Sequence, residues 1–197
     1  MTKLHKIPCV ILCGGRSSRM GEDKSLLPFS NSNSLTQYQY DKLKTFFDEI
    51  YLSSKVDKFD FLANKEKYLI LDKGEVFSPI VALQTIFKTI TSSKVFIITV
   101  DTPLVSIQSI EKLINESLDY NICVAQTQRI HNLCGVFSTD LKFFVDQMLN
   151  DDIHKVGYLL KNNITKYIKF DNEDEFINLN NKDEYHRALS IISKSNN

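Results

Sequence analysis

Short apolar segments alternate along this chain with longer segments of helical periodicity, and this alternation constrains the fold most. Strand-length runs rich in Val, Ile and Phe cover residues 7–12, 50–52, 95–100, 122–125 and 133–137. Apolar residues recur at helical spacing through 35–50, 80–90 and 107–118. Runs that are apolar on both faces are typical of a covered sheet. The pattern therefore predicts an α/β fold, a mostly parallel sheet with helices on both faces and ligand-binding loops after the strands.

The last third of the chain is less regular. We expect helices over 140–149 and 155–160, an edge strand over 167–170 and a closing helix over 183–193. Residues 176–181 alternate polar with apolar side chains, as an edge strand does. Neither a repeat nor a linker interrupts the 197 residues, so we expect a single domain over 1–197.

Charge and cysteine usage exclude several classes of protein. Lys and Arg number 24, as do Asp and Glu, and this balance argues against non-specific binding of nucleic acid or of a membrane surface. The four cysteines, Cys9, Cys13, Cys123 and Cys134, lie in apolar runs without zinc spacing, which predicts core thiols. No apolar stretch has the length of a membrane span, and the run 7–13 is too short for a signal peptide. We expect a soluble, cytoplasmic protein.

The most unusual segment follows the first predicted strand and reads LCGGRSSRMGEDK over residues 12–24. The adjacent Gly14 and Gly15 allow a tight turn that brings bare backbone N–H groups close to an anion. Arg16, Arg19 and Lys24 supply positive charge for phosphate oxygens. The segment lacks the G-x-x-x-x-G-K-[ST] spacing of a P-loop. It predicts a triphosphate site; a solvated Gly/Ser turn is the alternative interpretation.

A carboxylate follows the middle predicted strand. Asp101 ends the apolar run 95–100 and precedes Thr102 and Pro103, so it should emerge at the same edge of the sheet as the glycine loop. Such a carboxylate can hold Mg²⁺, whose remaining ligands come from substrate phosphates and water. The alternative is an Asp that caps the next helix.

The glycine loop resembles the L-x-G-G-x-S-x-R-M-G-x-D-K signature of the molybdenum cofactor guanylyltransferases. The matching residues are Leu12, Gly14, Gly15, Ser17, Arg19, Met20, Gly21, Asp23 and Lys24. The resemblance implies a Rossmann-like sheet of the nucleotide-diphospho-sugar transferase type. It also implies transfer of GMP from GTP to the phosphate of molybdopterin, with Mg²⁺ as cofactor. Transient contacts with proteins that deliver molybdopterin or receive the product would follow from that activity.

The same resemblance assigns roles to residues near the nucleotide. Leu12, Cys13, Gly14 and Gly15 would line the nucleotide, Arg19 and Lys24 would neutralise its phosphates, and Asp101 would bind the metal ion. These last three are the predicted catalytic residues. Part of the chain, roughly 1–105, would then bind the nucleotide, and roughly 106–192 would bind the acceptor.

Further nucleotide contacts are predicted less directly. An Asp binds GTP in the family where Asp72 stands, although an exposed turn Asp is the alternative. Ser53 replaces a family Asn. Ser78 and Pro79 have the chemistry of a helix start, and Pro79 falls in the family's guanine-binding G-P-L-x-G segment. Ser78 and Ala82 replace both glycines of that segment, which leaves the choice of base open.

Polar residues of the second half are candidates for binding the acceptor. These are His131, Asn132, His154, Lys155, Asn178 and Asn180. His131 and Asn132 precede a predicted strand like the family's H-P pair, and Asn178 and Asn180 match its N-x-N-T-P segment. Asn180 is also the second candidate metal ligand. Solvated surface residues and simple turns are the alternative interpretations.

Two other functions remain open from the sequence alone. The chain could be a nucleotidyltransferase for another base or acceptor, such as a cytidylyltransferase or a sugar-phosphate enzyme. It could also be a regulatory protein that binds a nucleotide without turnover. The presence of Lys24 and Asp101 favours an enzyme.

Overall fold

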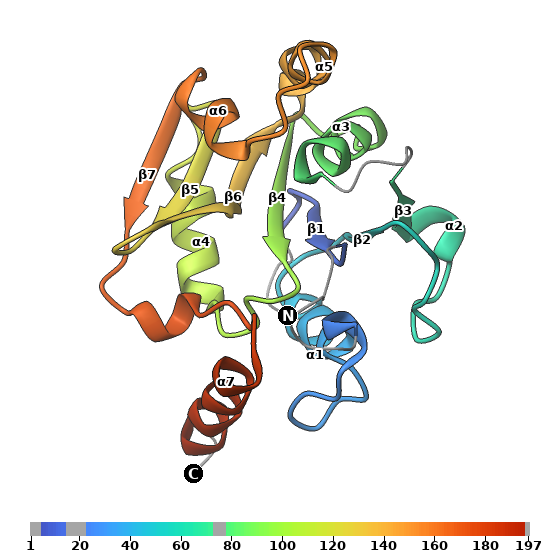
Figure 1. Cartoon of the computed structure of the whole chain (residues 1–197), viewed down its shortest axis with the longest axis vertical. Coiled ribbons are helices and arrows are strands. Elements are labelled where there is room, and N and C mark those ends of the chain that lie inside the picture. The colour runs from blue at the N-terminus through green and yellow to red at the C-terminus, as the bar shows by residue number, and fades with distance from the viewer. Residues whose placement is uncertain (1–4, 15–22, 73–77, 196–197) are drawn as a thin grey trace.

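The computed structural model describes residues 5–14, 23–72 and 78–195. In this part of the chain, the strands form one sheet in the order β3-β2-β1-β4-β6-β5-β7 (Figure 1). They are β1 (Cys9–Leu12), β2 (Ile50–Ser54), β3 (Leu69–Leu71), β4 (Lys94–Thr99), β5 (Ile122–Gln126), β6 (Ile130–Ser138) and β7 (Thr165–Lys169). β6 runs antiparallel to β4 and β5, whereas the other neighbouring pairs are parallel. The predicted mostly parallel sheet is confirmed.

Helices cover both faces of this sheet. They are α1 (Leu35–Leu43), α2 (Lys65–Tyr68), α3 (Pro79–Thr89), α4 (Ile107–Asn115), α5 (Lys142–Asn150), α6 (Val156–Lys161) and α7 (Lys182–Ser195), with 3-10 turns η1 (Lys24–Leu26), η2 (Thr139–Leu141) and η3 (Glu173–Phe176). Apolar residues of α1, α4 and α7 form one core cluster, and those of α3, α5 and α6 form another. β1 divides its side chains between the two, because successive residues of a strand point to opposite faces.

Serine side chains define where three of the helices begin. The hydroxyls of Ser34, Ser78 and Ser106 accept hydrogen bonds from backbone N–H groups in the first turns of α1, α3 and α4. Pro79 is the first residue of α3, where its missing N–H costs nothing. The predicted helix start at Ser78 and Pro79 is confirmed.

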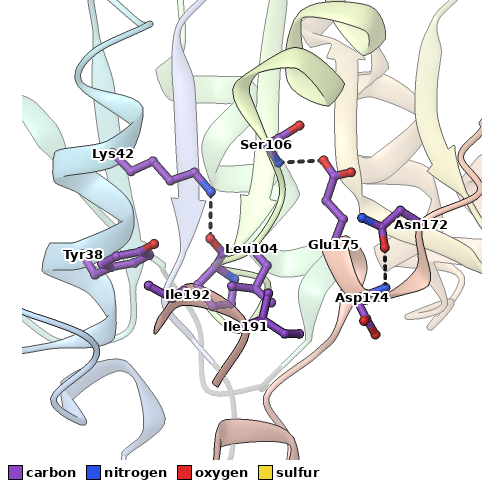
Figure 2. A pocket seen from close by; sticks show the side chains of 10 residues that line it. Tyr38, Lys42, Leu104, Ser106, Asn172, Asp174, Glu175, Ile191 and Ile192 are labelled. Carbon is purple, nitrogen blue, oxygen red and sulfur yellow. Dashed lines mark hydrogen bonds between the residues drawn. The ribbon is translucent and has the colours of Figure 1, made fainter. Parts of the chain in front are cut away.

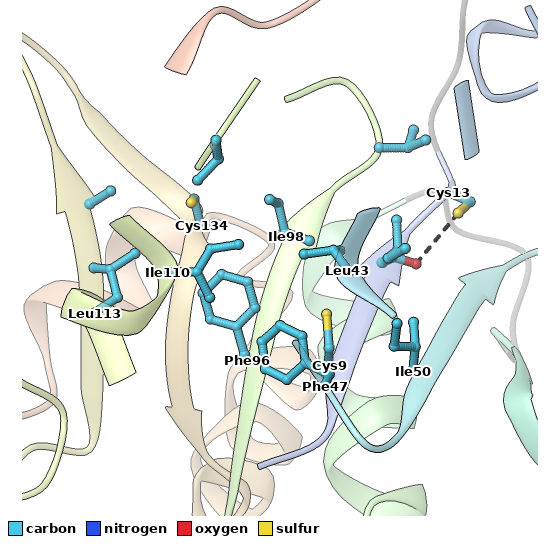
Figure 3. Packing of buried hydrophobic residues seen from close by; sticks show 14 of the residues in the cluster. Cys9, Cys13, Leu43, Phe47, Ile50, Phe96, Ile98, Ile110, Leu113 and Cys134 are labelled. Carbon is cyan, nitrogen blue, oxygen red and sulfur yellow. Dashed lines mark hydrogen bonds between the residues drawn. The ribbon is translucent and has the colours of Figure 1, made fainter. Parts of the chain in front are cut away.

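The four cysteines are buried and free, as predicted. Figure 3 shows Cys9 and Cys134 packed among Phe47, Phe96 and other apolar side chains of the α1 and α4 side. Burial raises the pKa of the Cys13 and Cys134 thiols to about 12. Both are therefore neutral core groups at physiological pH.

Several expected element boundaries were wrong. The expected helix over 35–50 ends at Leu43, and a turn after it carries Phe47 into the core. The expected edge strand over 176–181 is absent from the described sheet, because η3 ends at Phe176 and the next segment bonds to the turn after β4 instead. His131 and Asn132 lie inside β6 rather than before it, and Ser53 lies inside β2. The short α2 and β3 were not predicted as elements.

The helices in the described ranges are all too short or too polar to cross a membrane.

Candidate functional site

The candidate site lies where β1 and β4 end side by side. Leu12 is the register partner of Thr99 in this parallel pair, and the Val100 N–H donates to the Leu12 carbonyl at 3.0 Å. Gly14 and Asp101 each follow two residues later, at the same edge of the sheet. β2 and β3 extend the sheet from β1 in one direction, and β4 begins the other (Figure 1). Such a reversal of strand order is where open α/β sheets bind ligands.

Three predicted site residues meet at this edge. The Lys24 ammonium lies 3.3 Å from Asp101 Oδ2 and 3.2 Å from Asn180 Oδ1, and donates to both. Lys24 begins η1, which Asp23 caps. The segment before α7 reaches the site because the Leu179 N–H donates to the Asp101 carbonyl at 2.8 Å. Residues separated by 77 and 156 positions in sequence thus share one contact group.

One carboxylate oxygen of Asp101 is available to bind a cation. Asp101 Oδ1 is buried and has no hydrogen-bond partner among the described residues. Asp101 does not cap α4, because Ser106 does so. In the described ranges no three His, Cys, Asp or Glu side chains are grouped to hold a metal ion. A carboxylate and an amide oxygen suit Mg²⁺, which takes its other ligands from phosphates and water. The residues present therefore fit a divalent cation.

Lys58 closes the base of the glycine loop and was missed from the sequence. Its ammonium donates to the Cys13 carbonyl at 3.3 Å and to Asp23 Oδ2 at 2.5 Å, so it joins the two described ends of the loop. Burial raises the pKa of Asp23, but hydrogen bonds from Lys58 and Ser25 outweigh it and hold that pKa below its usual value. A single Lys far along the chain carried no pattern that could have revealed this role. Gly15 and Arg19 lie outside the described residues.

Ser53 and Asp72 lie together beside the start of the glycine loop. Ser53 Oγ donates to Asp72 Oδ1 at 2.9 Å, and the Ser53 carbonyl accepts from the Cys13 N–H at 2.8 Å. A Cβ on Gly14 would stand 3.8 Å from Asp72 Oδ2. Burial raises the pKa of the Asp72 carboxyl. Asp72 is therefore half-buried against the loop rather than an exposed turn residue.

His154 lies at the N-terminus of α3. Its Nδ1 is 3.1 Å from Ser78 Oγ, and its Nε2 is 2.9 Å from Asp152 Oδ1. The contact places His154 beside Pro79, among the residues predicted to bind the base. Lys155 is exposed and precedes α6, which has six residues. The structure therefore gives no support to a phosphate site at the start of α6.

The other candidate acceptor residues lie around β6 and η3. His131 is buried, with Nε2 2.9 Å from Thr127 Oγ1 and its ring centroid 4.9 Å from that of Phe176. Burial and the nearby Arg129 charge lower the pKa of His131, which favours the neutral ring. Asn132 is exposed.

Arg129 is a second residue that sequence reasoning missed. Its guanidinium donates to Asn178 Oδ1 at 3.0 Å, two residues from Asn180. Arg129 therefore brings an exposed positive charge to the segment that reaches Asp101. It lies between β5 and β6, where its sequence neighbours offered no motif.

Comparisons with known proteins identify the family of this chain. Residues 9–163 match the model of the MobA-like NTP transferase domain. A molybdenum cofactor guanylyltransferase of Campylobacter jejuni subsp. doylei is 38% identical over 192 residues, covering 96% of this chain and 99% of that protein. One from Helicobacter pylori is 31% identical, covering 98% and 93%.

A solved structure extends the comparison to the fold. Molybdopterin-guanine dinucleotide biosynthesis protein A from Archaeoglobus fulgidus superposes with a TM-score of 0.78 at 18% identity, covering 95% of this chain and all of that one. At that identity the likeness concerns the fold alone. It confirms the Rossmann-like sheet of the nucleotide-diphospho-sugar transferase type.

Proposed function

This chain belongs to the MobA-like NTP transferase family, and on that premise we propose that it transfers GMP from GTP to the phosphate of molybdopterin, releasing pyrophosphate. The names of relatives at 31% and 38% identity over nearly the whole chain support this choice of substrates. The observation that carries the proposal is the meeting of Lys24, Asp101 and Asn180 at the sheet edge where Gly14 follows β1. A glycine that opens the loop, a cation and two oxygen ligands at one sheet edge suit a polyphosphate substrate.

The reaction requires mainly that the two substrates are correctly positioned. An oxygen of the molybdopterin phosphate attacks the α-phosphorus of GTP; a new P–O bond forms, and the bond from the α-phosphorus to the bridging oxygen breaks. The nucleophile is already anionic at neutral pH, so no general base is required. The chain's residues need only hold two anions together and neutralise the charge on the departing pyrophosphate. Lys24, joined by Arg19, would serve that second role.

Mg²⁺ is the proposed cofactor, with Asp101 and Asn180 as its protein ligands. When bound, the ion would supply positive charge that neutralises phosphate oxygens. The free Asp101 Oδ1 and the Lys24 ammonium already between Asp101 and Asn180 support a cation at this place. Asp72 is the proposed acceptor for the nucleoside, and the fully buried Ser53 would hold it by donating to Asp72 Oδ1.

The proposed binding site for the acceptor, molybdopterin, includes Asn178 and Arg129. Arg129 is exposed and beside the segment that carries Asn180, so its guanidinium is suited to the molybdopterin phosphate. His131 and Asn132 remain candidates on β6, whereas His154 contacts Ser78 on the α3 side, away from Arg129. Contacts with proteins that deliver molybdopterin, a cytoplasmic location and the division near residue 105 remain predictions.

Pyrophosphate release with molybdopterin and Mg²⁺ tests the proposal. We expect release with GTP to exceed release with CTP, ATP or UTP, and to disappear without molybdopterin. Asp101→Asn should abolish most of the activity, whereas Asp171→Asn, an exposed carboxylate outside the site, should retain it. Preference for CTP would transfer the assignment to a cytidylyltransferase. Nucleotide binding without release would indicate a regulatory protein.

A further inference from the structure

Helix α1 holds the backbone turn that carries Asp101. Gln39 and Lys42 lie three residues apart, so they share one face of the helix. Gln39 Nε2 lies 3.2 Å from the Thr99 carbonyl and 3.4 Å from the Thr102 carbonyl. The Lys42 ammonium donates to the carbonyls of Pro103 at 2.7 Å and Val105 at 2.5 Å. The two side chains therefore bond to the backbone on both sides of Asp101.

A second set of bonds holds the same turn from the opposite side. Glu175 of η3 accepts from the Ser106 N–H at 2.7 Å, and the Leu179 N–H donates to the Asp101 carbonyl. Figure 2 shows Lys42 reaching from α1 to the turn, with Glu175 facing it across a pocket of about 340 Å³. The Asp101 turn is thus fixed by side chains from two separate elements.

Gln39 and Lys42 carry energetic costs beside the bonds that they donate. Gln39 is almost fully buried, yet among the described residues its Oε1 has no hydrogen-bond partner. Burial of the Lys42 ammonium lowers its pKa to about 8, although the charge of Glu175 opposes the shift. A buried oxygen without a partner and a partly desolvated cation both disfavour the folded state. Apolar residues of similar length would avoid both costs, but they could not donate to the turn.

We infer that Gln39 and Lys42 are positioning residues that fix the Asp101 turn and thereby set the affinity of the site for a divalent cation. Their side-chain donors bond to the backbone of residues 99–105, and through that backbone they would act on Asp101. The inference rests on the proposed function only in taking Asp101 as the cation ligand. A displacement of a single ligand oxygen is enough to weaken binding, because Mg²⁺ demands near-ideal octahedral geometry.

Direct cation binding separates positioning from a structural role. We would measure Mn²⁺ affinity from the free-Mn²⁺ electron paramagnetic resonance signal, without nucleotide because a triphosphate binds Mn²⁺ by itself, at a temperature well below the Tm of each variant. Lys42→Met and Gln39→Met keep the length of the side chain and remove its donors. Lys44→Met is the matched control, since Lys44 is exposed and two residues along the chain from Lys42. Asp101→Asn reports on the ligand itself.

We expect Mn²⁺ affinity to fall about fivefold or more in Lys42→Met and by a smaller factor in Gln39→Met, with Lys44→Met like the parent. In turnover assays the Mg²⁺ concentration for half-maximal rate should rise while the KM for molybdopterin stays unchanged. Unchanged Mn²⁺ affinity in both folded variants, with affinity lost in Asp101→Asn, would overturn the positioning role alone. Unchanged affinity in Asp101→Asn would instead remove the cation-ligand role from the proposed function.

Discussion

The predicted site residues fall in two regions of the molecule. One region is the edge where β1 and β4 end, and the other surrounds β6 and α6. Of the residues that the structure describes, the predicted ones are in contact in the first region but not in the second. At the first, Lys24, Asp101 and Asn180 are in direct contact. At the second, His131 packs against Phe176, while His154 binds Ser78 at the start of α3. Sheet register brings Gly14 and Asp101, which follow adjacent strands, to one edge, and the backbone bond from Leu179 carries Asn180 there. No comparable register links His131, inside β6, with His154, before α6. Predictions at the ends of β1 and β4 were therefore sharper than those for the second set.

Removal of the Asp101 charge is expected to have the largest effect. Asp101→Asn keeps the shape of the side chain and the backbone bond from Leu179, but weakens cation binding. We expect kcat/KM for GTP to fall about 10³-fold at limiting Mg²⁺, as for other groups that stabilise charge in a transition state. Steady-state pyrophosphate release measures it. Turnover within tenfold of the parent would show that the strand edge does not hold the reacting phosphates.

The buried Lys42, which bonds to the Asp101 turn, should make the free energy of unfolding depend on pH. Its pKa falls from 10.5 to about 8 because of burial, so between these values the unfolded chain binds more protons than the folded protein. The free energy of unfolding therefore rises with pH across this window through Lys42. Relative to Lys42→Met, the parent should gain up to about 3 kcal/mol between pH 8 and 10.5.

Denaturant unfolding of both proteins across this pH range measures the gain. Taking the difference between them cancels the tyrosines and other lysines that titrate there. A constant difference would contradict burial of the ammonium, and with it the close contact between α1 and the Asp101 turn.

Lys24 should matter somewhat less than Asp101. Lys24→Met removes the ammonium that contacts both oxygen ligands, and we expect kcat to fall about 10²-fold with little change in Tm. Lys161→Met on the exposed side of α6 is the control. Single-turnover measurements separate chemistry from product release. A change confined to KM would make Lys24 a substrate-binding group without a role in the reaction step.

Arg129 tests whether the second region binds the acceptor. Arg129→Ala removes an exposed donor to Asn178, so we expect the KM for molybdopterin to rise about fivefold while the KM for GTP is unchanged. His154→Gln should leave the molybdopterin KM unchanged, because His154 contacts the start of α3. If the molybdopterin KM instead rose in His154→Gln and stayed unchanged in Arg129→Ala, the acceptor would bind on the α6 side rather than beside Arg129.

Local sequence patterns predicted most of the fold and the part of the site formed by the glycine loop and Asp101. The glycine pair after an apolar run and the aspartate after another predicted one edge, and the β1–β4 register places Gly14 and Asp101 there. Lys58, Arg129 and Gln39 were not predicted as site or positioning residues. Each acts on a partner remote in sequence, and a single Lys, Arg or Gln on a polar segment has no distinguishing pattern.

The sequence by itself determined the alternation of strands and helices, the buried thiols and the glycine loop with its carboxylate, because periodicity and residue chemistry are local properties. Only the tertiary structure decided that Asn180 reaches Lys24, that His154 turns to Ser78, and that α1 grips the Asp101 turn. Those contacts arise when helices pack on the two faces of the sheet and carry distant side chains together. Their geometry depends on the whole core rather than on any one segment.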